Sequence, residues 1–242
     1  MSRDGSDRVN VLLNAEALAT QGFVVVPGPF STEDLVQVQA DYASACARAA
    51  PDDVHIGRSS TRVTDFVNRG AAFEPIYTWP PALDAARRVV NGRFRLSAFH
   101  ARTLHPGASA QELHVDLPRN SDAWPMLGAI FMIDEFRPDN GATRFVPGSH
   151  RWTELPEQML ADRVASHPDE VVACGPAGSM ILFDASTWHG YTANTSSVGR
   201  RSLQGTFIPY SGRPATDFVA RMQPETLARL GAVAREVIGL GP

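Results

Sequence analysis

The stretch Gln111-Glu112-Leu113-His114-Val115-Asp116 places a histidine and a carboxylate two residues apart. Alternate side chains of a β-strand project to the same face, so His114 and Asp116 are expected to point into one space. A metal bound there needs a third ligand from another strand. His189 is the candidate, because it follows the apolar run Met-Ile-Leu-Phe at 180–183. Two histidines and one carboxylate on one face of a metal are typical of non-haem Fe(II) sites.

An arginine downstream strengthens this interpretation. Arg200 follows His189 by 11 residues and begins the predicted strand Arg-Arg-Ser-Leu-Gln-Gly-Thr-Phe. If Arg200 faces inward, alternation places Ser202 and Gln204 on the same face and Arg201 on the other. A polar row inside a small barrel indicates a site, and a guanidinium there can hold a carboxylate through two hydrogen bonds. We therefore interpret Arg200 as a ligand-binding residue and Arg201 as a surface charge.

Short strands dominate the chain after residue 92. Each is bounded by Pro, Gly, Asn or Asp. This pattern of short strands separated by turn residues favours a β-sandwich or barrel. The predicted strands cover residues 93–104, 126–133, 142–146, 171–174, 179–183 and 202–209. The turn dipeptides Asn140-Gly141 and Pro147-Gly148 predict that the segment 140–150 turns between core strands, so His150 is not expected to bind a metal.

Helical patterns flank these strands. A first helix is expected where Val9, Leu12, Leu13 and Ala17 recur at helical spacing, followed by a strand at 23–26 and a helix capped by Ser31. Residues 52–81 have no clean period, so a long irregular segment followed by a short helix at 83–90 is predicted, which together form a variable loop at about 52–92. A closing helix is predicted at 224–238. Without a repeat or linker, we expect one domain over residues 1–242.

Composition excludes several function classes. The chain has 22 basic and 26 acidic residues, and every basic residue is Arg. The absence of Lys excludes lysine Schiff-base chemistry and the Gly-Lys-Ser/Thr phosphate loop. The arginines are scattered, so nucleic acid is not an expected partner. Cys46 and Cys174 do not suggest a disulfide framework, and no leader or membrane span is apparent, so we expect a cytoplasmic protein without membrane contact.

Three segments together resemble the phytanoyl-CoA dioxygenase-like (PhyH) family of Fe(II)/2-oxoglutarate oxygenases. They are the residues 111–116 quoted above, the run Asn-Gly-Ala-Thr-Arg-Phe-Val-Pro-Gly-Ser-His at 140–150, and Trp188-His189-Gly190 followed by Asn194 and Arg200. The opening Gly-Phe-Val-Val-Val-Pro-Gly at 22–28 is similar to that family's N-terminal region. The resemblance extends over about residues 15–209 and is weakest at 52–92 and 150–170.

The resemblance implies a mainly β fold with flanking helices, built on a double-stranded β-helix, the jelly-roll and cupin-like barrel. It implies Fe(II) held by His114, Asp116 and His189, with O2 and 2-oxoglutarate as co-substrates and stimulation by ascorbate. The 5-carboxylate of 2-oxoglutarate would bind Arg200. Many relatives carry Ser two residues after the second metal histidine, where this chain has Tyr191. The expected residues around the co-substrate are Gln111, Tyr191, Arg200 and Ser202.

The implied reaction is oxidation of an unactivated C–H bond in a small molecule, with hydroxylation as the main expectation. Halogenating relatives have a small residue at the carboxylate position, whereas this chain retains Asp116. An amino acid or a natural-product intermediate is the expected substrate. The candidate substrate residues are Arg58, Arg62, Phe66, Trp79, Phe99, Arg102, Trp124 and Trp152.

Two alternatives stay open from the sequence. The first is a cupin-type metalloenzyme that does not use 2-oxoglutarate, although cupins usually show His-x-His followed by Glu where this chain has His114 and Asp116. The second is a non-catalytic jelly roll that binds a small molecule. The full set of three ligands together with Arg200 argues against a decayed site.

Overall fold

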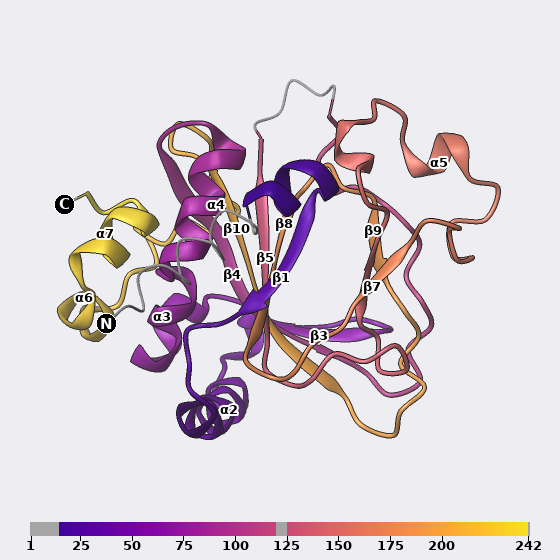
Figure 1. Ribbon diagram of the computed structural model, residues 1–242. Coiled ribbons are helices and arrows are strands. Elements are labelled where there is room, and N and C mark those ends of the chain that lie inside the picture. The colour runs from indigo at the N-terminus through magenta and orange to yellow at the C-terminus, as the bar shows by residue number, and fades with distance from the viewer. Residues whose placement is uncertain (1–14, 120–124, 242) are drawn as a thin grey trace, which may run out of the picture.

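Two antiparallel sheets form the centre of the computed structural model, which describes residues 15–119 and 125–241 (Figure 1). The larger sheet has the strand order β1 (Phe23–Pro27), β8 (Ser179–Asp184), β5 (Leu127–Met132), β10 (Arg200–Pro209), β4 (Phe94–Leu104), β3 (Ser60–Val63) and β2 (Val54–Ile56). The smaller sheet has the order β7 (Val171–Ala173), β6 (Thr143–Phe145) and β9 (His189–Tyr191). This two-sheet architecture with flanking helices is the jelly-roll fold that the sequence predicted.

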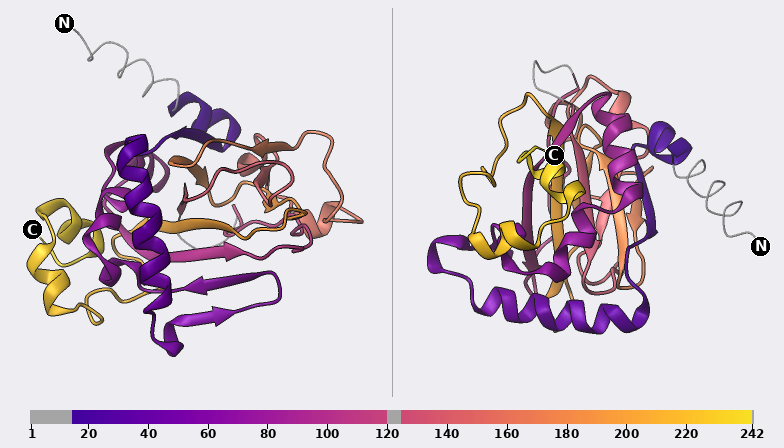
Figure 2. Two further views of the ribbon diagram at one scale, coloured as in Figure 1. Left: turned by 90° about the horizontal axis from the view of Figure 1, so that it is seen from below. Right: turned by 90° about the vertical axis from the view of Figure 1, so that its left-hand side faces the viewer.

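Helices cover the face of the larger sheet that points away from the smaller one (Figures 1 and 2). They are α2 (Thr32–Ala47), α3 (Glu74–Tyr77), α4 (Pro80–Val90), α6 (Pro224–Arg229) and α7 (Ala232–Ile238). The short helix α5 (Pro156–Met159) lies on the other side, beyond the smaller sheet. Short 3-10 helices occupy Pro51–Asp53, Phe66–Arg69, Ala71–Phe73 and Ser149–Arg151. No helix in the described part of the chain is long and apolar enough to cross a bilayer.

Strand alternation divides the apolar interior into two layers. In β5, Leu127 and Phe131 point toward the helices and join the larger core, whereas Ile130 and Met132 point toward the smaller sheet. The second layer is rich in rings, and Phe23 stacks on Phe145 with ring centroids 4.4 Å apart. Burial of each such large apolar side chain stabilises the fold by about 1.5–3 kcal/mol.

Helix α2 shows how local sequence signals determine an element. The Ser31 hydroxyl accepts a hydrogen bond of 3.1 Å from the Asp34 backbone N–H, which caps the first turn. Glu33 and Asp34 place negative charge at the positive end of the helix dipole. Leu35 and Val38 begin the buried stripe that packs on the sheet. The helix and its core-facing side agree with the sequence prediction.

Three regions differ from the sequence predictions. Residues 52–92 are not mainly an irregular loop, because they form the hairpin β2–β3 and the helices α3 and α4. The predicted closing helix at 224–238 is two helices separated at Leu230 and Gly231, where the Gly231 N–H donates to Glu74 Oε1 over 3.1 Å. The predicted first helix lies partly outside the described residues, and the part that is described is helical at 15–21.

Candidate metal centre and active-site cavity

His114, Asp116 and His189 converge beside the smaller sheet, and each offers a ligand atom within 4.8 Å of the other two. Asp116 Oδ1 lies 3.8 Å from His114 Nε2, and Asp116 Oδ2 lies 3.6 Å from His189 Nε2. Nitrogen and oxygen ligands bind a divalent metal at about 2.0–2.2 Å, so ligand atoms around one ion lie roughly 3–4 Å apart. The three side chains therefore fit one metal ion.

Backbone carbonyls fix the orientation of both imidazoles. His114 Nδ1 lies 3.0 Å from the Glu112 carbonyl oxygen, and His189 Nδ1 lies 2.8 Å from the Thr187 carbonyl oxygen. An Nδ1–H that donates to a carbonyl leaves the lone pair of Nε2 free for a metal. Burial lowers the pKa of His189 and favours the neutral imidazole, which is the metal-binding form.

Arg200 is a buried charge at the start of β10. Its side chain is only 3% exposed, and its Nε and one terminal nitrogen have no hydrogen-bond partner. The guanidinium carbon lies 4.0 Å from the centroid of the Phe136 ring. Burial and the nearby charge of Arg102 lower the pKa of Arg200 to about 9. A buried cation without a hydrogen-bonded partner is costly, so the geometry calls for an anionic ligand at this position.

One cavity of about 340 Å³ joins the metal centre to Arg200. Its polar side comes from β4 and β10, and its apolar side includes Met126, Ile130 and Phe183. The other lining residues with functional side chains are Arg62, His100, Arg102, Gln111, His114, Asp116, Thr143, His189, Tyr191, Arg200, Gln204 and Thr206. Its size and mixed lining are those of a small-molecule site.

The residues expected around the co-substrate lie at or beside this cavity. Gln111 and Tyr191 line it, and the Tyr191 hydroxyl donates to Ser59 Oγ over 3.0 Å. Ser202 is fully buried on the same face of β10 as Arg200, with its hydroxyl 3.4 Å from the Arg102 carbonyl oxygen. Arg201 faces the other way and pairs with Asp134, as the alternation predicts.

Of the eight expected substrate residues, Arg62 and Arg102 line the cavity. Phe66 and Phe99 do not, because both belong to the core between the helices and the larger sheet, where their ring centroids lie 6.4 Å apart. On β4 the odd-numbered Phe99 points to the helices, while the even-numbered Arg102 points into the cavity. Because side chains alternate between the two faces of a strand, Phe99 and Arg102 cannot both line the cavity, and the prediction for Phe99 is wrong.

The remaining expected substrate residues also lie elsewhere. Trp79 precedes α4 and packs against the larger core, and Arg58 is exposed in the turn between β2 and β3. Trp152 is 38% exposed and contacts Trp188 edge-on at 5.0 Å, outside the residues that line the cavity. Trp124 lies outside the described residues.

Sequence reasoning missed His100 as a cavity residue. His100 precedes Arg102 by two positions on β4, so it shares the inward face. It is opposite Gln204 of β10, and its Nε2 has no hydrogen-bond partner. Burial, followed by the charges of Arg62 and Arg102, lowers its pKa to about 4, so the ring is neutral at pH 7. Because Arg102 was expected to face the site, the same strand alternation would have predicted that His100, two residues earlier, also faces it.

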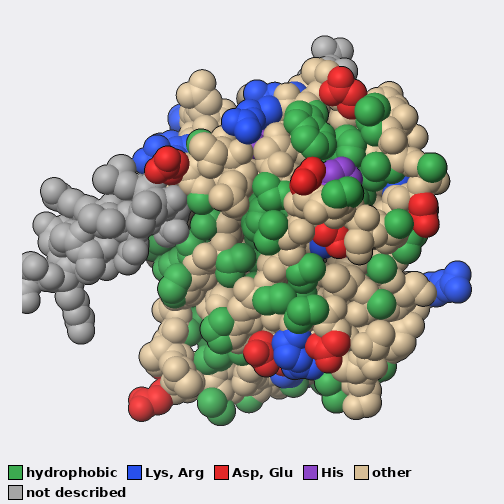
Figure 3. Space-filling view, turned by 45° about the vertical axis from the view of Figure 1, so that its right-hand side comes forward, with side chains coloured by type: hydrophobic (Ala, Val, Ile, Leu, Met, Phe, Trp, Pro, Cys, Tyr) green, Lys and Arg blue, Asp and Glu red, His purple; other side chains and the backbone are tan. Residues whose placement is uncertain are grey.

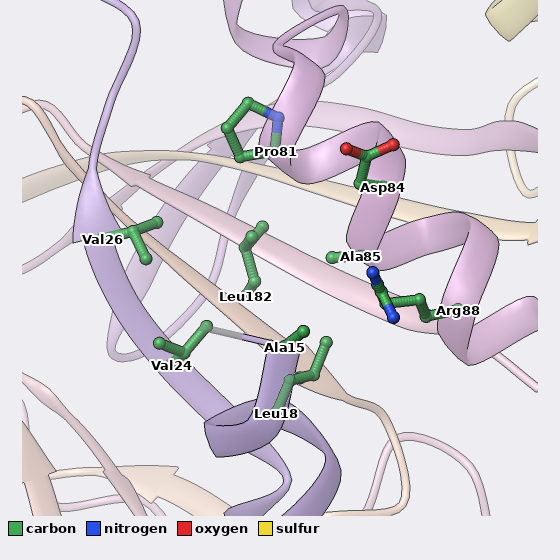
Figure 4. A pocket seen from close by; sticks show the side chains of 9 residues that line it. All are labelled: Ala15, Leu18, Val24, Val26, Pro81, Asp84, Ala85, Arg88 and Leu182. Atoms are coloured by element: carbon green, nitrogen blue, oxygen red, sulfur yellow. The ribbon is translucent and has the colours of Figure 1, made fainter. Parts of the chain in front are cut away.

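A second pocket lies apart from the metal centre, between the helical residues 15–21, β1 and α4 (Figure 4). Val24, Val26 and Leu182 point into it, and its volume is only about 30 Å³. This is room for roughly one water molecule, and the walls are largely apolar. The pocket is a packing gap between helix and sheet and offers no ligand site comparable to the main cavity.

Figure 3 shows how charged side chains are distributed on one face of the molecule. Basic side chains there are scattered among acidic and apolar ones and do not form a continuous area. Three further arginines, Arg62, Arg102 and Arg200, line the cavity.

Comparison with known proteins identifies the family of this chain. The family model described as phytanoyl-CoA dioxygenase (PhyH) matches residues 18–202, which include all three candidate ligands and Arg200. The chain belongs to the phytanoyl-CoA dioxygenase family. This match confirms the family that the sequence resembles, and the structure brings together the His-Asp-His set that the resemblance implies.

The similar proteins of known sequence include fungal dioxygenases. Dioxygenase af480 of Aspergillus fumigatus is 29% identical over 170 residues, which are 66% of this PhyH chain and 52% of the relative. Dioxygenase trt7 of Aspergillus terreus is 30% identical over 199 residues, which are 76% of this chain and 66% of the relative. The chain thus spans about half to two thirds of the length of these relatives.

Solved structures share the fold at lower identity. HygX from Streptomyces hygroscopicus, solved with nickel, 2-oxoglutarate and hygromycin B, aligns with a TM-score of 0.68 at 18% identity over 84% of this chain and 88% of its own. SnoN, an α-ketoglutarate-dependent epimerase from nogalamycin biosynthesis, aligns with a TM-score of 0.68 at 18% identity over 86% and 87%. The carbocyclase SnoK from the same pathway has a TM-score of 0.66 at 19% identity over 90% of each chain.

Proposed function

We propose that this PhyH-family enzyme oxidises an unactivated C–H bond of a small molecule, with hydroxylation as its principal reaction. The observation that carries the proposal is the single cavity that joins the three-residue metal centre to the unpaired, buried Arg200. A natural-product intermediate or an amino acid is the substrate class we favour. The fold similarity to HygX, which was solved with hygromycin B, and to SnoN and SnoK from nogalamycin biosynthesis supports the former.

The residues present fit iron and 2-oxoglutarate. His114, Asp116 and His189 would hold Fe(II) from one side, which leaves its remaining positions open toward the cavity. Arg200 would bind the 5-carboxylate of 2-oxoglutarate, because its unpaired nitrogens form a fork that matches a carboxylate. When bound, iron and 2-oxoglutarate would let O2 act as the oxidant of the substrate C–H bond, with 2-oxoglutarate oxidised to succinate and CO2.

The chain itself contributes orientation and a controlled environment. The two backbone carbonyls that accept from the histidine Nδ1 atoms hold both rings in place without adding charge. Gln111 and Tyr191 border the cavity beside the ligands and are positioned to contact the co-substrate. Met126, Ile130 and Phe183 form an apolar wall of the cavity, against which the target carbon would lie.

Succinate formation tests the proposal. The iron-loaded enzyme is incubated with 2-oxoglutarate, ascorbate and air, alone and with a panel of amino acids and natural-product scaffolds. We expect succinate in the wild type, increased by a true substrate, and no succinate in Asp116→Ala. Product mass then separates hydroxylation, which adds one oxygen atom, from epimerisation, which leaves the mass unchanged, and from ring closure, which removes two hydrogens. Absence of succinate from the iron-loaded wild type under every condition contradicts the proposal.

A further inference from the structure

Three arginines line the cavity, although the proposed co-substrate needs only one. Arg62, Arg102 and Arg200 all border it, and none of them forms an ion pair with a carboxylate in the described part of the chain. Asp116 is the sole acidic residue among the described residues that line the cavity. The cavity of the protein alone is therefore strongly cationic.

The strand register makes this arrangement costly. Arg62 of β3 and Arg102 of β4 are direct cross-strand partners, and like charges at such positions destabilise a sheet. Arg102 is also largely buried beside Tyr191, with its guanidinium carbon 5.1 Å from the ring centroid, and its Nε has no hydrogen-bond partner. Burial and the charge of Arg62 lower the pKa of Arg102, which reports the same unfavourable environment.

The loaded site does not remove the excess charge. The positive charges of Fe(II) and the Arg200 guanidinium are cancelled by the negative charges of Asp116 and of the two carboxylates of 2-oxoglutarate. Arg62 and Arg102 remain as two uncompensated cations at the cavity wall. Arg62 is exposed to solvent, whereas Arg102 is partly buried. A partly buried charge is stabilised when a counter-charge pairs with it, so the protein loaded with Fe(II) and 2-oxoglutarate is expected to attract a further anion to Arg102.

We infer that the substrate of this enzyme carries an anionic group, a carboxylate or a phosphate, that binds Arg102 with the help of Arg62. This inference rests on the proposed function, because it assigns Arg200 to the co-substrate. Arg102 presents a fork of donors, and the stacked Tyr191 ring holds the guanidinium plane in a fixed direction. His100, two residues away on the same face, offers an uncharged ring whose Nε2 is free to hydrogen-bond the same substrate.

Matched probe compounds test the inference. Fe(II) and 2-oxoglutarate are added anaerobically to the enzyme, and the visible absorption of their chelate gives the 2-oxoglutarate affinity. Phenyl-substituted carboxylic acids of increasing chain length, their primary amides and the matching phosphate monoesters are then titrated, and the change in that absorption gives their affinities. We expect the best acid or phosphate to bind at least about ten-fold more tightly than its neutral counterpart.

Arg102→Gln should remove this preference for the anion while the affinity for 2-oxoglutarate changes by less than about three-fold. Arg62→Gln, at an exposed position that tolerates substitution, should reduce the same preference. Arg95→Gln is the matched control, because Arg95 lies on the same strand, stacks on Tyr210 with its guanidinium carbon 5.5 Å from the ring centroid, and does not border the cavity. It should retain the full preference.

The possible failures are distinguishable. If the wild-type enzyme binds Fe(II) but no 2-oxoglutarate, the proposed function itself is wrong. If 2-oxoglutarate binds and acids bind no better than amides, the inference is wrong and the proposed function stands. If Arg102→Gln weakens 2-oxoglutarate as strongly as Arg200→Gln does, Arg102 serves the co-substrate, which also overturns the inference. Tighter binding by phosphates than by carboxylates, or the reverse, identifies which anion the substrate carries.

Discussion

His114 and His189 are hydrogen-bonded to each other through their backbones as an isolated antiparallel bridge. Each N–H donates to the other residue's carbonyl oxygen over 2.9 Å, and the imidazole centroids lie 4.3 Å apart. The spacing of the two nitrogen ligands is therefore determined by strand pairing and does not depend on flexible loops. This rigidity is what a preformed metal centre requires.

Removing the carboxylate ligand should disable the site without unfolding the protein. Asp116 is partly exposed, so Asp116→Ala leaves no buried cavity, but it deletes one of three protein ligands. We expect Fe(II) affinity and succinate formation to fall by more than about 100-fold with little change in melting temperature. Asp139→Ala, which removes an exposed carboxylate that pairs with Arg137, is the control. Unchanged turnover in Asp116→Ala would remove this residue from the metal centre.

Arg200→Gln should act on 2-oxoglutarate and spare the metal. Loss of one partner of a buried charge pair costs about 2–5 kcal/mol, which corresponds to a rise of at least about 30-fold in the KM for 2-oxoglutarate. Fe(II) affinity should be unaffected because Arg200 is not a ligand. Arg201→Gln, one residue along β10 and paired with Asp134 on the other face, should behave like the wild type. Equal effects of the two substitutions would contradict the assigned role of Arg200.

His100 should make the metal-free protein less stable in mild acid. Burial and two arginines lower its pKa from about 6.5 to about 4, so the unfolded chain binds more protons than the folded one between these values. Stability attributable to neutral His100 is present above pH 6.5 and is lost as the pH falls, by up to about 3 kcal/mol near pH 4. Urea unfolding of wild type and His100→Gln across this range measures the effect. A parallel pH dependence in both proteins would show that His100 does not titrate in this way.

Gly141 should be intolerant of a side chain for two reasons. Its φ of +84° lies in the left-handed region, and an added Cβ would overlap the Leu104 side chain. Gly107 has a φ of +72° but faces open space, so a substitution there measures the cost in stability of the backbone conformation alone. We expect Gly107→Ala to cost about 1 kcal/mol and Gly141→Ala clearly more, measured by denaturant unfolding. Equal losses would mean that Leu104 moves aside at no cost.

Elements with a local signal could be predicted from the sequence. The predicted strands at 93–104, 126–133 and 179–183 agree with β4, β5 and β8 to within two residues at each end, because alternation and turn residues mark them directly. The three candidate ligands, which lie together in the structure, were proposed from a two-residue spacing and a downstream strand. The break near Gly231 could not be predicted, because it depends on Glu74, 157 residues earlier.

Side chains in the cavity were harder to predict than the metal ligands. Phe99 and Arg102 were both predicted to contact the substrate, but they lie on opposite faces of β4. Between residues 52 and 92, no period was visible, so the hairpin that carries Arg62 was missed and Phe66 could not be assigned to the core. The face of a short strand depends on what packs against it, and a single sequence does not contain that information.

Binding of iron and 2-oxoglutarate in the cavity can be measured by an anaerobic titration of the protein with Fe(II) and 2-oxoglutarate, followed by the visible absorption of the chelate. We expect one saturable complex per chain in the wild type, no complex in Asp116→Ala, and a complex in Arg200→Gln that forms only at much higher 2-oxoglutarate concentration. Iron binding without the absorption band in the wild type, or a band with the same midpoint in Arg200→Gln, would show that the cavity does not bind 2-oxoglutarate in this way.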